Sequence, residues 1–268
     1  MKSTANQLVR LFCAFSLASA GFAGTALAQE SSALVQPRAI SDRAGVAATP
    51  SAQDVLAKYL NATGGRKAWN KIHSRVSQGN VIIPGMNLIG TAQMFEEAPD
   101  RALVKIVVSD STFLEGFDGN VAWSSDSKQG VRQLTDAQAD ETRRESDFRF
   151  PVDFPELYPS LSAPAATTID GRAVYVIDAT PPGATQPDRA YFDAQSGLLI
   201  RMVTQHHNDD GSTEPFREDF SDYRAVDGVM IPFTIHQTGA QVDFTIQIKN
   251  VQQNIPVDDT RFAKPVAQ

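Results

Sequence analysis

Residues 241–251 read QVDFTIQIKNV, and apolar and polar side chains alternate along them. The apolar positions run from Val242 to Ile248 at every second residue, and the polar positions lie between them. A period of two is typical of a β-strand that buries one face and exposes the other. This stretch therefore predicts a half-buried strand.

Other strand-like runs lie upstream and are separated by turn signals. β-Branched and apolar residues are concentrated at 81–83, 103–108, 173–179, 198–203 and 229–235. Turn-forming pairs lie between such runs, at Asp118-Gly119, Asp170-Gly171, Ser196-Gly197, Asp210-Gly211 and Asp227-Gly228. Asp-Gly pairs favour tight hairpins, which join antiparallel neighbours. The pattern predicts a mainly β (α+β) fold in a single domain, with one large antiparallel sheet or a barrel-like one.

Helical signals precede the strands. Thr49 can cap a helix, Pro50 suits its first position, and the apolar side chains of residues 55–60 share one face. The pair Gly64-Gly65 is expected to end this helix. Residues 66–72 (RKAWNKI) predict a short second helix.

The middle of the chain departs from the strand pattern. Residues 135–147 are polar and predict a helix that Thr135 caps. Residues 148–164 combine aromatic and leucine side chains with four prolines, and so many prolines exclude a central strand or a long helix. Such a segment must still bury its rings. Two interpretations stay open, a loop packed over a satellite cluster and a cover over a ligand.

The N-terminus has the three parts of a cleavable secretory signal. Lys2 and Arg10 supply positive charge, residues 11–20 (LFCAFSLASA) are uncharged and largely apolar, and residues 26–28 (ALA) are small. We therefore expect cleavage before Gln29. The apolar run is shorter than the roughly 20 residues that span a bilayer, so we do not expect an integral membrane segment.

We therefore divide the chain into a signal peptide (1–28), a flexible tether (29–48) and one β domain (49–268). The only cysteine, Cys13, leaves with the signal. Of the 24 Lys and Arg residues, two lie in the signal, which leaves 22 against 31 Asp and Glu and a formal charge of −9. An acidic protein of this kind lacks the electrostatic footprint of a nucleic-acid binder.

No catalytic or metal-binding signature stands out. The densest group of potential metal ligands is His206-His207 with Asp209 and Asp210. Adjacent histidines of a strand point to opposite sides, so we interpret this group as a solvated turn. The carboxylates of Glu96-Glu97 and Glu218-Asp219 are interpreted as solvated too. The sequence predicts no enzyme, no cofactor and no metal, and leaves open only an active site assembled from distant residues.

Several landmarks, taken in order, resemble one family of bacterial exported proteins, the LolA/LolB-like outer-membrane lipoprotein-sorting proteins. The resemblance covers roughly residues 53–265. Its motifs are 64–69 (GGRKAW), 116–123 (GFDGNVAW), 191–199 (YFDAQSGLL), 222–232 (DYRAVDGVMIP) and 254–259 (NIPVDD) followed by Phe262. Most of these motifs are hairpin turns flanked by aromatic residues.

The resemblance implies a strongly curved antiparallel sheet, an incomplete β-barrel whose concave side is closed by helices and a loop. In carriers of that family the concave apolar cavity holds acyl chains. The expected function is therefore a periplasmic carrier or binder of a lipid-like ligand, namely lipoprotein acyl chains or another lipid. Because the same fold serves in envelope regulators that bind proteins, an envelope protein-binding module is the alternative, and a hydrolase with a scattered site comes third.

The expected binding residues follow from this hypothesis, in which the aromatic segment lines or covers the mouth of the cavity. They are Phe148, Phe150, Phe154, Leu157, Tyr158, Trp69 and Trp123. The two tryptophans are more often core residues than ligand contacts. The expected partners are lipid or lipoprotein acyl chains and, for the alternative, an envelope protein. The expected location is the periplasm, with secretion as the other outcome of export.

Overall fold

The computed structural model describes residues 49–208, 211–240 and 242–266, so the predicted signal peptide and tether lie outside the described residues. Fourteen strands form one antiparallel sheet, in the order β6-β5-β4-β3-β2-β1-β14-β13-β12-β11-β10-β9-β7, with β8 also paired to β9. The strands are β1 (Ser74–Ile83), β2 (Leu88–Glu97), β3 (Arg101–Val108), β4 (Ser111–Phe117), β5 (Ala122–Asp126), β6 (Gly130–Gln133), β7 (Ser160–Leu161), β8 (Ala165–Ile169), β9 (Arg172–Thr180), β10 (Asp188–Asp193), β11 (Leu199–His207), β12 (Thr213–Val226), β13 (Val229–Thr238) and β14 (Asp243–Gln253).

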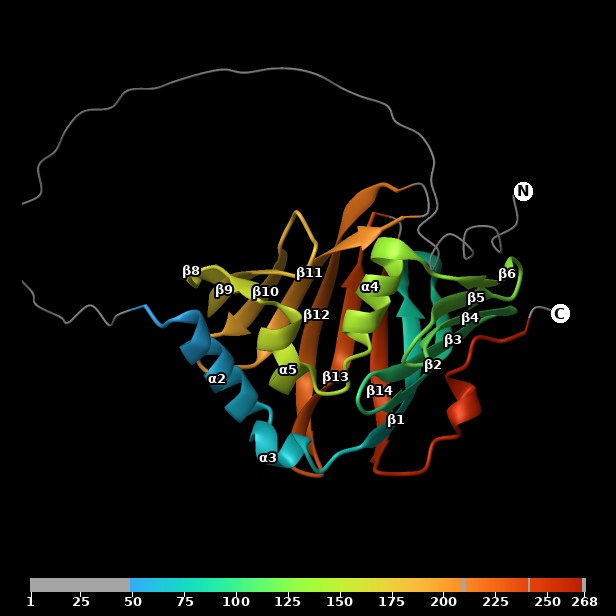
Figure 1. The fold of residues 1–268 in the computed structure, drawn as a ribbon, viewed down its shortest axis with the longest axis horizontal. Helices are drawn as coiled ribbons and strands as arrows, with labels where there is room; N and C mark the ends of the chain where they lie inside the picture. The colour runs from blue at the N-terminus through green and yellow to red at the C-terminus, as the bar shows by residue number, and fades with distance from the viewer. Residues whose placement is uncertain (1–48, 209–210, 241, 267–268) are drawn as a thin grey trace, which may run out of the picture.

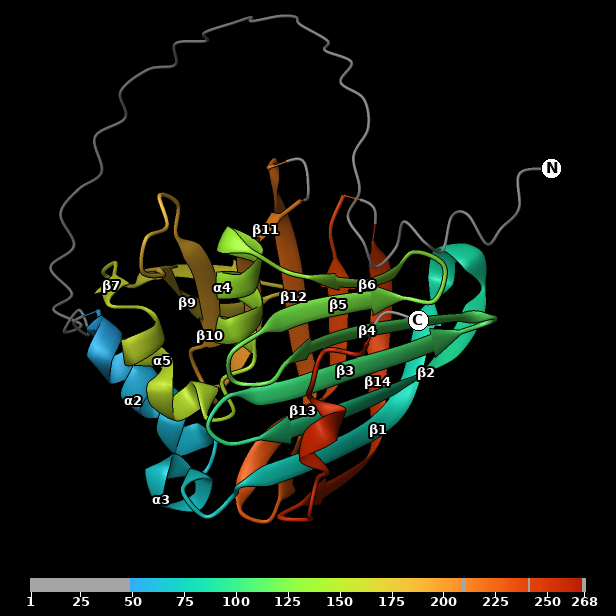
Figure 2. The ribbon, with the colours of Figure 1, turned by 45° about the vertical axis from the view of Figure 1, so that its right-hand side comes forward.

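The sheet is strongly curved and does not close (Figure 1; Figure 2). Its two arms are β2 to β6 and β7 to β13, and they meet where β1 pairs with β14. One arm follows the other in the sequence, so this central pairing joins the first strand to the last. The predicted fold class, a mainly β curved antiparallel sheet, is confirmed.

The apolar runs and turn pairs predicted from the sequence match the strands and hairpin turns of the structure. Each apolar run lies within a strand, except that Leu198 precedes the start of β11, and the QVDFTIQIKNV stretch supplies most of β14. At the β12–β13 hairpin, Asp227 and Gly228 both have positive φ (47° and 89°). Two successive positive φ values define a type I′ turn, whose twist matches that of the flanking strands. Asp210 lies outside the described residues.

In the part of the chain that the structure describes, four helices accompany the sheet: α2 (Ala52–Ala62), α3 (Gly65–Trp69), α4 (Asp136–Glu145) and α5 (Phe150–Leu157). Two short 3₁₀ turns, η1 (Pro84–Met86) and η2 (Asp259–Arg261), complete the elements. The predicted cap of the first helix was wrong, because Ser51, not Thr49, caps α2 through a reciprocal pair of bonds with Asp54. Thr135 lies at the N-cap position of α4, as predicted, but its side chain forms no cap hydrogen bond.

Helix α5 is a difference from the irregular segment that the prolines predicted. Pro151 lies in its first turn, where a missing N–H removes no hydrogen bond. Pro155 is inside the helix, but the helix has only eight residues and ends at Leu157, so little is lost. Proline therefore limits the length of this helix without preventing it.

The sheet buries side chains on both faces. On the concave face, one cluster centres on Ile231, Phe244 and Ile246, and a second joins α2 and α5 to β9, β10 and β11. On the convex face, the chain after β14 packs over β1 to β5, with Phe262 fully buried. Trp123 lies in this outer cluster, and its Nε1 donates to the carbonyl of Phe262 over 2.8 Å.

A close approach of two backbones fixes the corner between α2 and α3. Gly64 has φ +112°, and a Cβ added to it would lie 2.3 Å from the carbonyl oxygen of Gly228. The adjacent Met230 amide donates to the carbonyl of Thr63 over 3.0 Å. The corner therefore packs directly on the β12–β13 hairpin.

We expect Gly64→Ala to lower the free energy of unfolding by about 2 kcal/mol, through backbone strain and the clash together. Gly171→Ala is the matched control, because Gly171 has φ +77° and nothing within 4 Å of an added Cβ. The control should cost about 1 kcal/mol from strain alone. Urea unfolding of both variants measures the difference, and equal losses would contradict the contact.

No helix within the described ranges is both long and apolar enough to cross a membrane.

Candidate functional site

A cavity of about 510 Å³ lies between the concave face of the sheet and the helices. Its walls come from both arms of the sheet and from α4 and the start of α5, which lie in front of the sheet in Figure 1. The volume is within the roughly 300–1,000 Å³ of small-molecule sites. The curvature of the sheet thus creates a space that one organic ligand can fill.

One part of the cavity wall is apolar. Strands β13 and β14 contribute Ile231, Ile235, Phe244, Ile246 and Ile248. Strand β3 adds Val104 and Ile106, and the helical side adds Trp69 and Phe148. Side chains of this kind can gain roughly 0.8 kcal/mol for each CH₂ group of a ligand that they bury.

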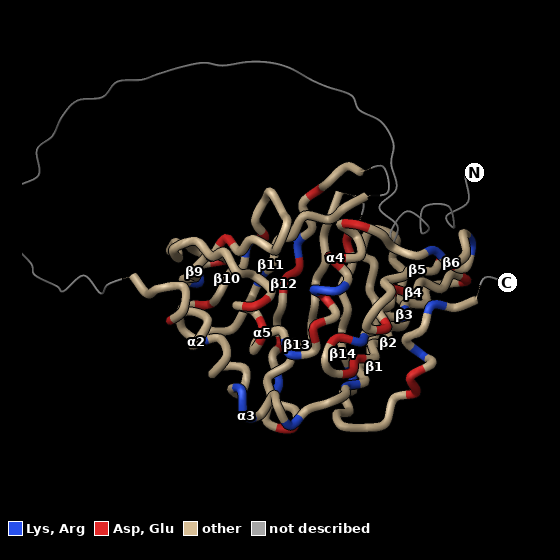
Figure 3. The backbone as a smooth tube through the Cα atoms, viewed as in Figure 1, with Lys and Arg blue, Asp and Glu red and all other residues tan. Residues whose placement is uncertain are grey.

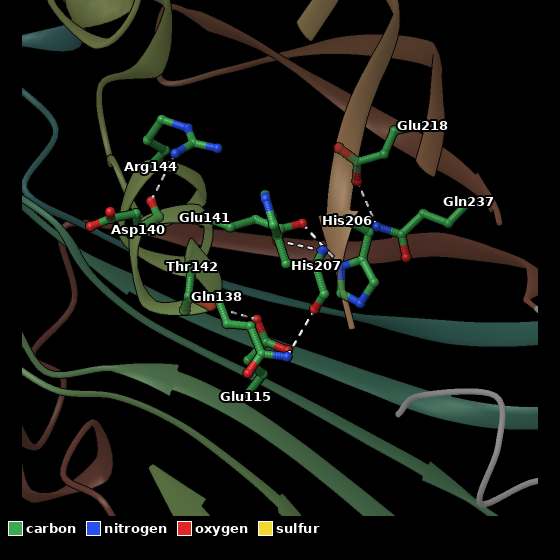
Figure 4. A network of polar contacts seen from close by, with 10 residues as sticks. All are labelled: Glu115, Gln138, Asp140, Glu141, Thr142, Arg144, His206, His207, Glu218 and Gln237. Carbon is green, nitrogen blue, oxygen red and sulfur yellow. Dashed lines mark hydrogen bonds and ion pairs between the residues drawn. The ribbon is translucent and has the colours of Figure 1, made fainter. Parts of the chain in front are cut away.

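Helix α4 spans the two arms, since it contacts β4 and β5 on one side and β11 on the other. Glu141 connects α4 to β11 (Figure 4). Its Oε1 lies 3.0 Å from Nδ1 of His206. Its Oε2 accepts from the amide of His207 and lies 3.4 Å from Nδ1 of that residue. On the β4 side, the Thr142 hydroxyl donates to Glu115. Helix α4 is therefore bonded to both arms of the sheet, on two sides of the cavity.

This arrangement corrects the interpretation of His206-His207 as a solvated turn. Their side chains are 35% and 31% exposed, and both rings reach the same carboxylate instead of pointing apart. The missing partner, Glu141, lies 65 residues away in the sequence from His206. A contact between residues so far apart in the sequence cannot be recognised from a local motif.

The wall near α4 is acidic, and Figure 3 shows acidic residues on this helix and on the strands around it. Glu115, Glu145 and Glu218 come from three elements and line the same space. Glu115 and Glu145 are accessible to solvent inside the cavity, but protein atoms surround them and partly desolvate them. Glu218 is half-buried and accepts a hydrogen bond from Gln237 over 2.6 Å. Glu218, interpreted from the sequence as a solvated strand position, is thus half-buried in the cavity wall.

Crowding of these carboxylates changes their protonation. Desolvation, followed by the negative charge of Glu141, raises the pKa of Glu115. Desolvation raises the pKa of Glu145 further, and the charges of Glu141, Glu218 and Glu115 add to it. The pKa of Glu218 is raised by desolvation against the hydrogen bond from Gln237. These carboxyl groups therefore keep their protons to a higher pH than fully solvated glutamates do.

An arginine lies toward the apolar end. The Arg75 side chain is 9% exposed, with its guanidinium carbon 5.4 Å from the ring centre of Trp69 and 5.0 Å from that of Phe148. Its Nη1 lies 3.4 Å from Glu96 across β1 and β2, and its Nε and Nη2 have no hydrogen-bond partner among the described residues. Two aromatic faces thus stabilise a charge that is only loosely paired.

The structure brings together four of the residues expected to bind a ligand. Trp69, Phe148, Phe150 and Tyr158 line the cavity. Phe154 is fully buried behind them, with Leu157 packed on the same cluster, and neither is among the lining residues. Trp123 packs on the convex face. A binding role for all seven residues stays a prediction.

Two further polar residues of the cavity region carry no recognisable signal in the sequence. Asp188 is 2% exposed and accepts from the Tyr158 hydroxyl over 3.0 Å. Thr204 is 7% exposed, lines the cavity, and has no hydrogen-bond partner for its hydroxyl among the described residues.

Within the described ranges, no group of three or more His, Cys, Asp or Glu side chains is arranged to hold a metal ion.

Comparison with known proteins identifies the fold. No protein-family model matches the sequence, and no curated protein matches it. Among solved structures, a LolA superfamily protein from Nitrosomonas europaea is similar with a TM-score of 0.52 and 14% identity, over 80% of this chain and 98% of that chain. A DUF1329 family protein from Desulfovibrio piger has a TM-score of 0.52 and 11% identity, over 79% of this chain and 96% of that chain. The protein therefore has a LolA-like fold.

Proposed function

We propose that this protein binds and carries a ligand with a long apolar part, a lipid or an acyl chain of a lipoprotein, in the cavity under the curved sheet. The observation that supports it best is the cavity itself, a space of about 510 Å³ with an apolar wall from β3, β13 and β14. A preformed apolar cavity binds such ligands without ordering new structure. The LolA-like fold is consistent with this role without deciding it.

The polar contacts around the cavity support binding over catalysis. Glu141 and the two histidines fasten α4 to β11, and Glu115 fastens it to β4. These contacts hold a cover in place over the apolar wall. We place the protein in the periplasm because residues 1–28 have the features of a secretory signal.

Titration with N-phenyl-1-naphthylamine, an uncharged probe that fluoresces in apolar surroundings, tests the proposal. We expect saturable binding of one probe per protein at micromolar concentrations and its displacement by a neutral monoacylglycerol. Ile246→Glu should abolish the signal, because the substitution places a charge in the apolar wall. Lys249→Glu, an exposed change on the same strand, is the control and should bind as the parent does.

Mass spectrometry of an organic extract from the purified protein would identify a ligand that co-purifies. Acyl species in the extract support the proposal. A protein that binds neither the probe nor any acyl species would contradict it and favour the envelope protein-binding module.

A further inference from the structure

The charges that line the cavity are strongly unequal. Eight lining residues are acidic and three are Arg, so acidic side chains exceed Arg side chains by five. The acidic residues are Glu96, Glu115, Glu141, Glu145, Asp147, Asp188, Glu214 and Glu218, and the basic ones are Arg75, Arg132 and Arg144. A ligand with an anionic head group, such as a free fatty acid, would enter against this potential.

Four of the acidic residues gather at one end. Glu141 and Glu145 project from α4, Glu115 comes from β4, and Glu218 comes from β12. The negative charge of Glu141 acts on all three of the others, which places the four carboxylates in one neighbourhood. Figure 4 shows Glu115, Glu141 and Glu218 around the same space.

Protein cations compensate these carboxylates only in part. Among the described residues, none of Glu115, Glu145 and Glu218 forms an ion pair with Lys or Arg. Their hydrogen-bond partners are neutral, Thr142 for Glu115 and Gln237 for Glu218. Arg132, Arg144 and His206 also line this end and offset part of the charge. The carboxylates still outnumber them.

Thr204 is an independent sign that a polar ligand group belongs here. Its side chain follows Met202 and precedes His206 on the cavity-facing side of β11, and it is 7% exposed. Its hydroxyl has no hydrogen-bond partner among the described residues. Buried hydroxyls in folded proteins are nearly always bonded, so this one is placed to meet a group that enters the cavity.

We propose that this end of the cavity binds the cationic head group, an ammonium, of an amphiphile whose apolar chain lies against β13 and β14. The inference rests on the proposed function, because the apolar wall must hold the chain. Ammonium hydrogens would donate to the carboxylates of Glu145 and Glu218 and to the hydroxyl of Thr204. Such charge-assisted bonds favour an ammonium over a neutral hydroxyl of the same size.

Competition against bound N-phenyl-1-naphthylamine at pH 8 tests the proposal, with three ligands that share a ten-carbon chain: decylammonium, decanol and decanoate. Decylammonium and decanoate are used below their micelle concentrations, and decanol below its solubility limit. We expect decylammonium to bind about tenfold more tightly than decanol, since one charge-assisted bond of typical strength corresponds to about that factor. Decanoate should bind most weakly. Equal affinity for decylammonium and decanol, or tighter binding of decanoate, would overturn the inference and leave the proposed function intact. Failure of the probe itself to bind would overturn both.

Variants locate the head group. Glu218→Gln and Thr204→Val should each reduce the affinity for decylammonium about three- to tenfold and leave the affinity for decanol unchanged. Thr204→Val removes a hydroxyl without a partner, so its melting temperature should not fall, and this separates binding from folding. Glu156→Gln is the control, because it removes one negative charge from an exposed position of α5 outside the cavity lining. Equal losses in Glu156→Gln and Glu218→Gln would show a general charge effect and contradict the site.

Discussion

Replacing Phe154 with Ala is expected to lower the free energy of unfolding by about 3–5 kcal/mol, whereas replacing Phe150 should chiefly weaken ligand binding. Phe154 has no exposed surface. Its ring centre lies 4.8 Å from that of Tyr158 and 6.1 Å from that of Phe192, so the ring ties α5 to β10. Its loss would leave a cavity among rings that cannot collapse onto one another.

Phe150 occupies a different environment on the same helix. It is half-buried, it lines the cavity, and its ring meets that of Phe154 edge to face at 5.3 Å. We expect Phe150→Ala to cost about 1 kcal/mol of stability and to reduce the affinity for N-phenyl-1-naphthylamine about tenfold. A double substitution of both residues would mix the two effects.

Thermal melting and probe titration of the two single variants separate the roles. Phe154→Ala should melt at least 6 °C below the parent, at roughly 2–4 °C per kcal/mol for a chain of this size. Two results would contradict this assignment: a Phe154→Ala variant as stable as the parent, or a Phe150→Ala variant that binds the probe unchanged.

Local patterns were enough to predict the sheet. The period of two from Val242 to Ile248 and turn pairs such as Asp227-Gly228 act over a few residues, and the structure places both as predicted. Proline was harder to interpret, because its effect depends on position. Pro151 fits the first turn of α5, which a count of prolines cannot distinguish from an interior position.

The charged wall of the cavity could not be predicted in the same way. Glu141 and His206 are 65 residues apart in sequence and meet only because the sheet curves and α4 crosses it. Glu115 and Glu218 are polar positions of ordinary strands, and either face of such a strand can be the solvated one. Only the three-dimensional arrangement shows that their solvated face is the inside of a cavity.

This arrangement determines how stability depends on pH. Carboxyl groups with a pKa above that of the unfolded chain bind protons more tightly when folded, so stability falls as the pH rises through the folded pKa. Glu115, Glu145 and Glu218 are of this kind, and desolvation also raises the pKa of Asp147 to about 6. The pKa of His206 is raised by Glu141 against desolvation, and loss of its proton at high pH acts in the same direction. The protein should therefore be more stable at pH 5 than at pH 8.

We expect the free energy of unfolding to rise by about 1 kcal/mol or more from pH 8 to pH 5, since the raised pKa of Asp147 alone accounts for about one pKa unit over this range and one unit corresponds to about 1.4 kcal/mol. Groups with a lowered pKa, such as Asp54 and Asp193, stay ionised over this range and do not oppose the trend.

Glu218→Gln should raise the melting temperature at pH 8 by about 2–4 °C and change it little at pH 5. Glu156→Gln, on the exposed side of α5, should follow the parent at both pH values. Melting curves from pH 5 to pH 8 measure all three proteins, and a parent that becomes more stable toward pH 8 would show that the carboxylates are not crowded as the structure places them.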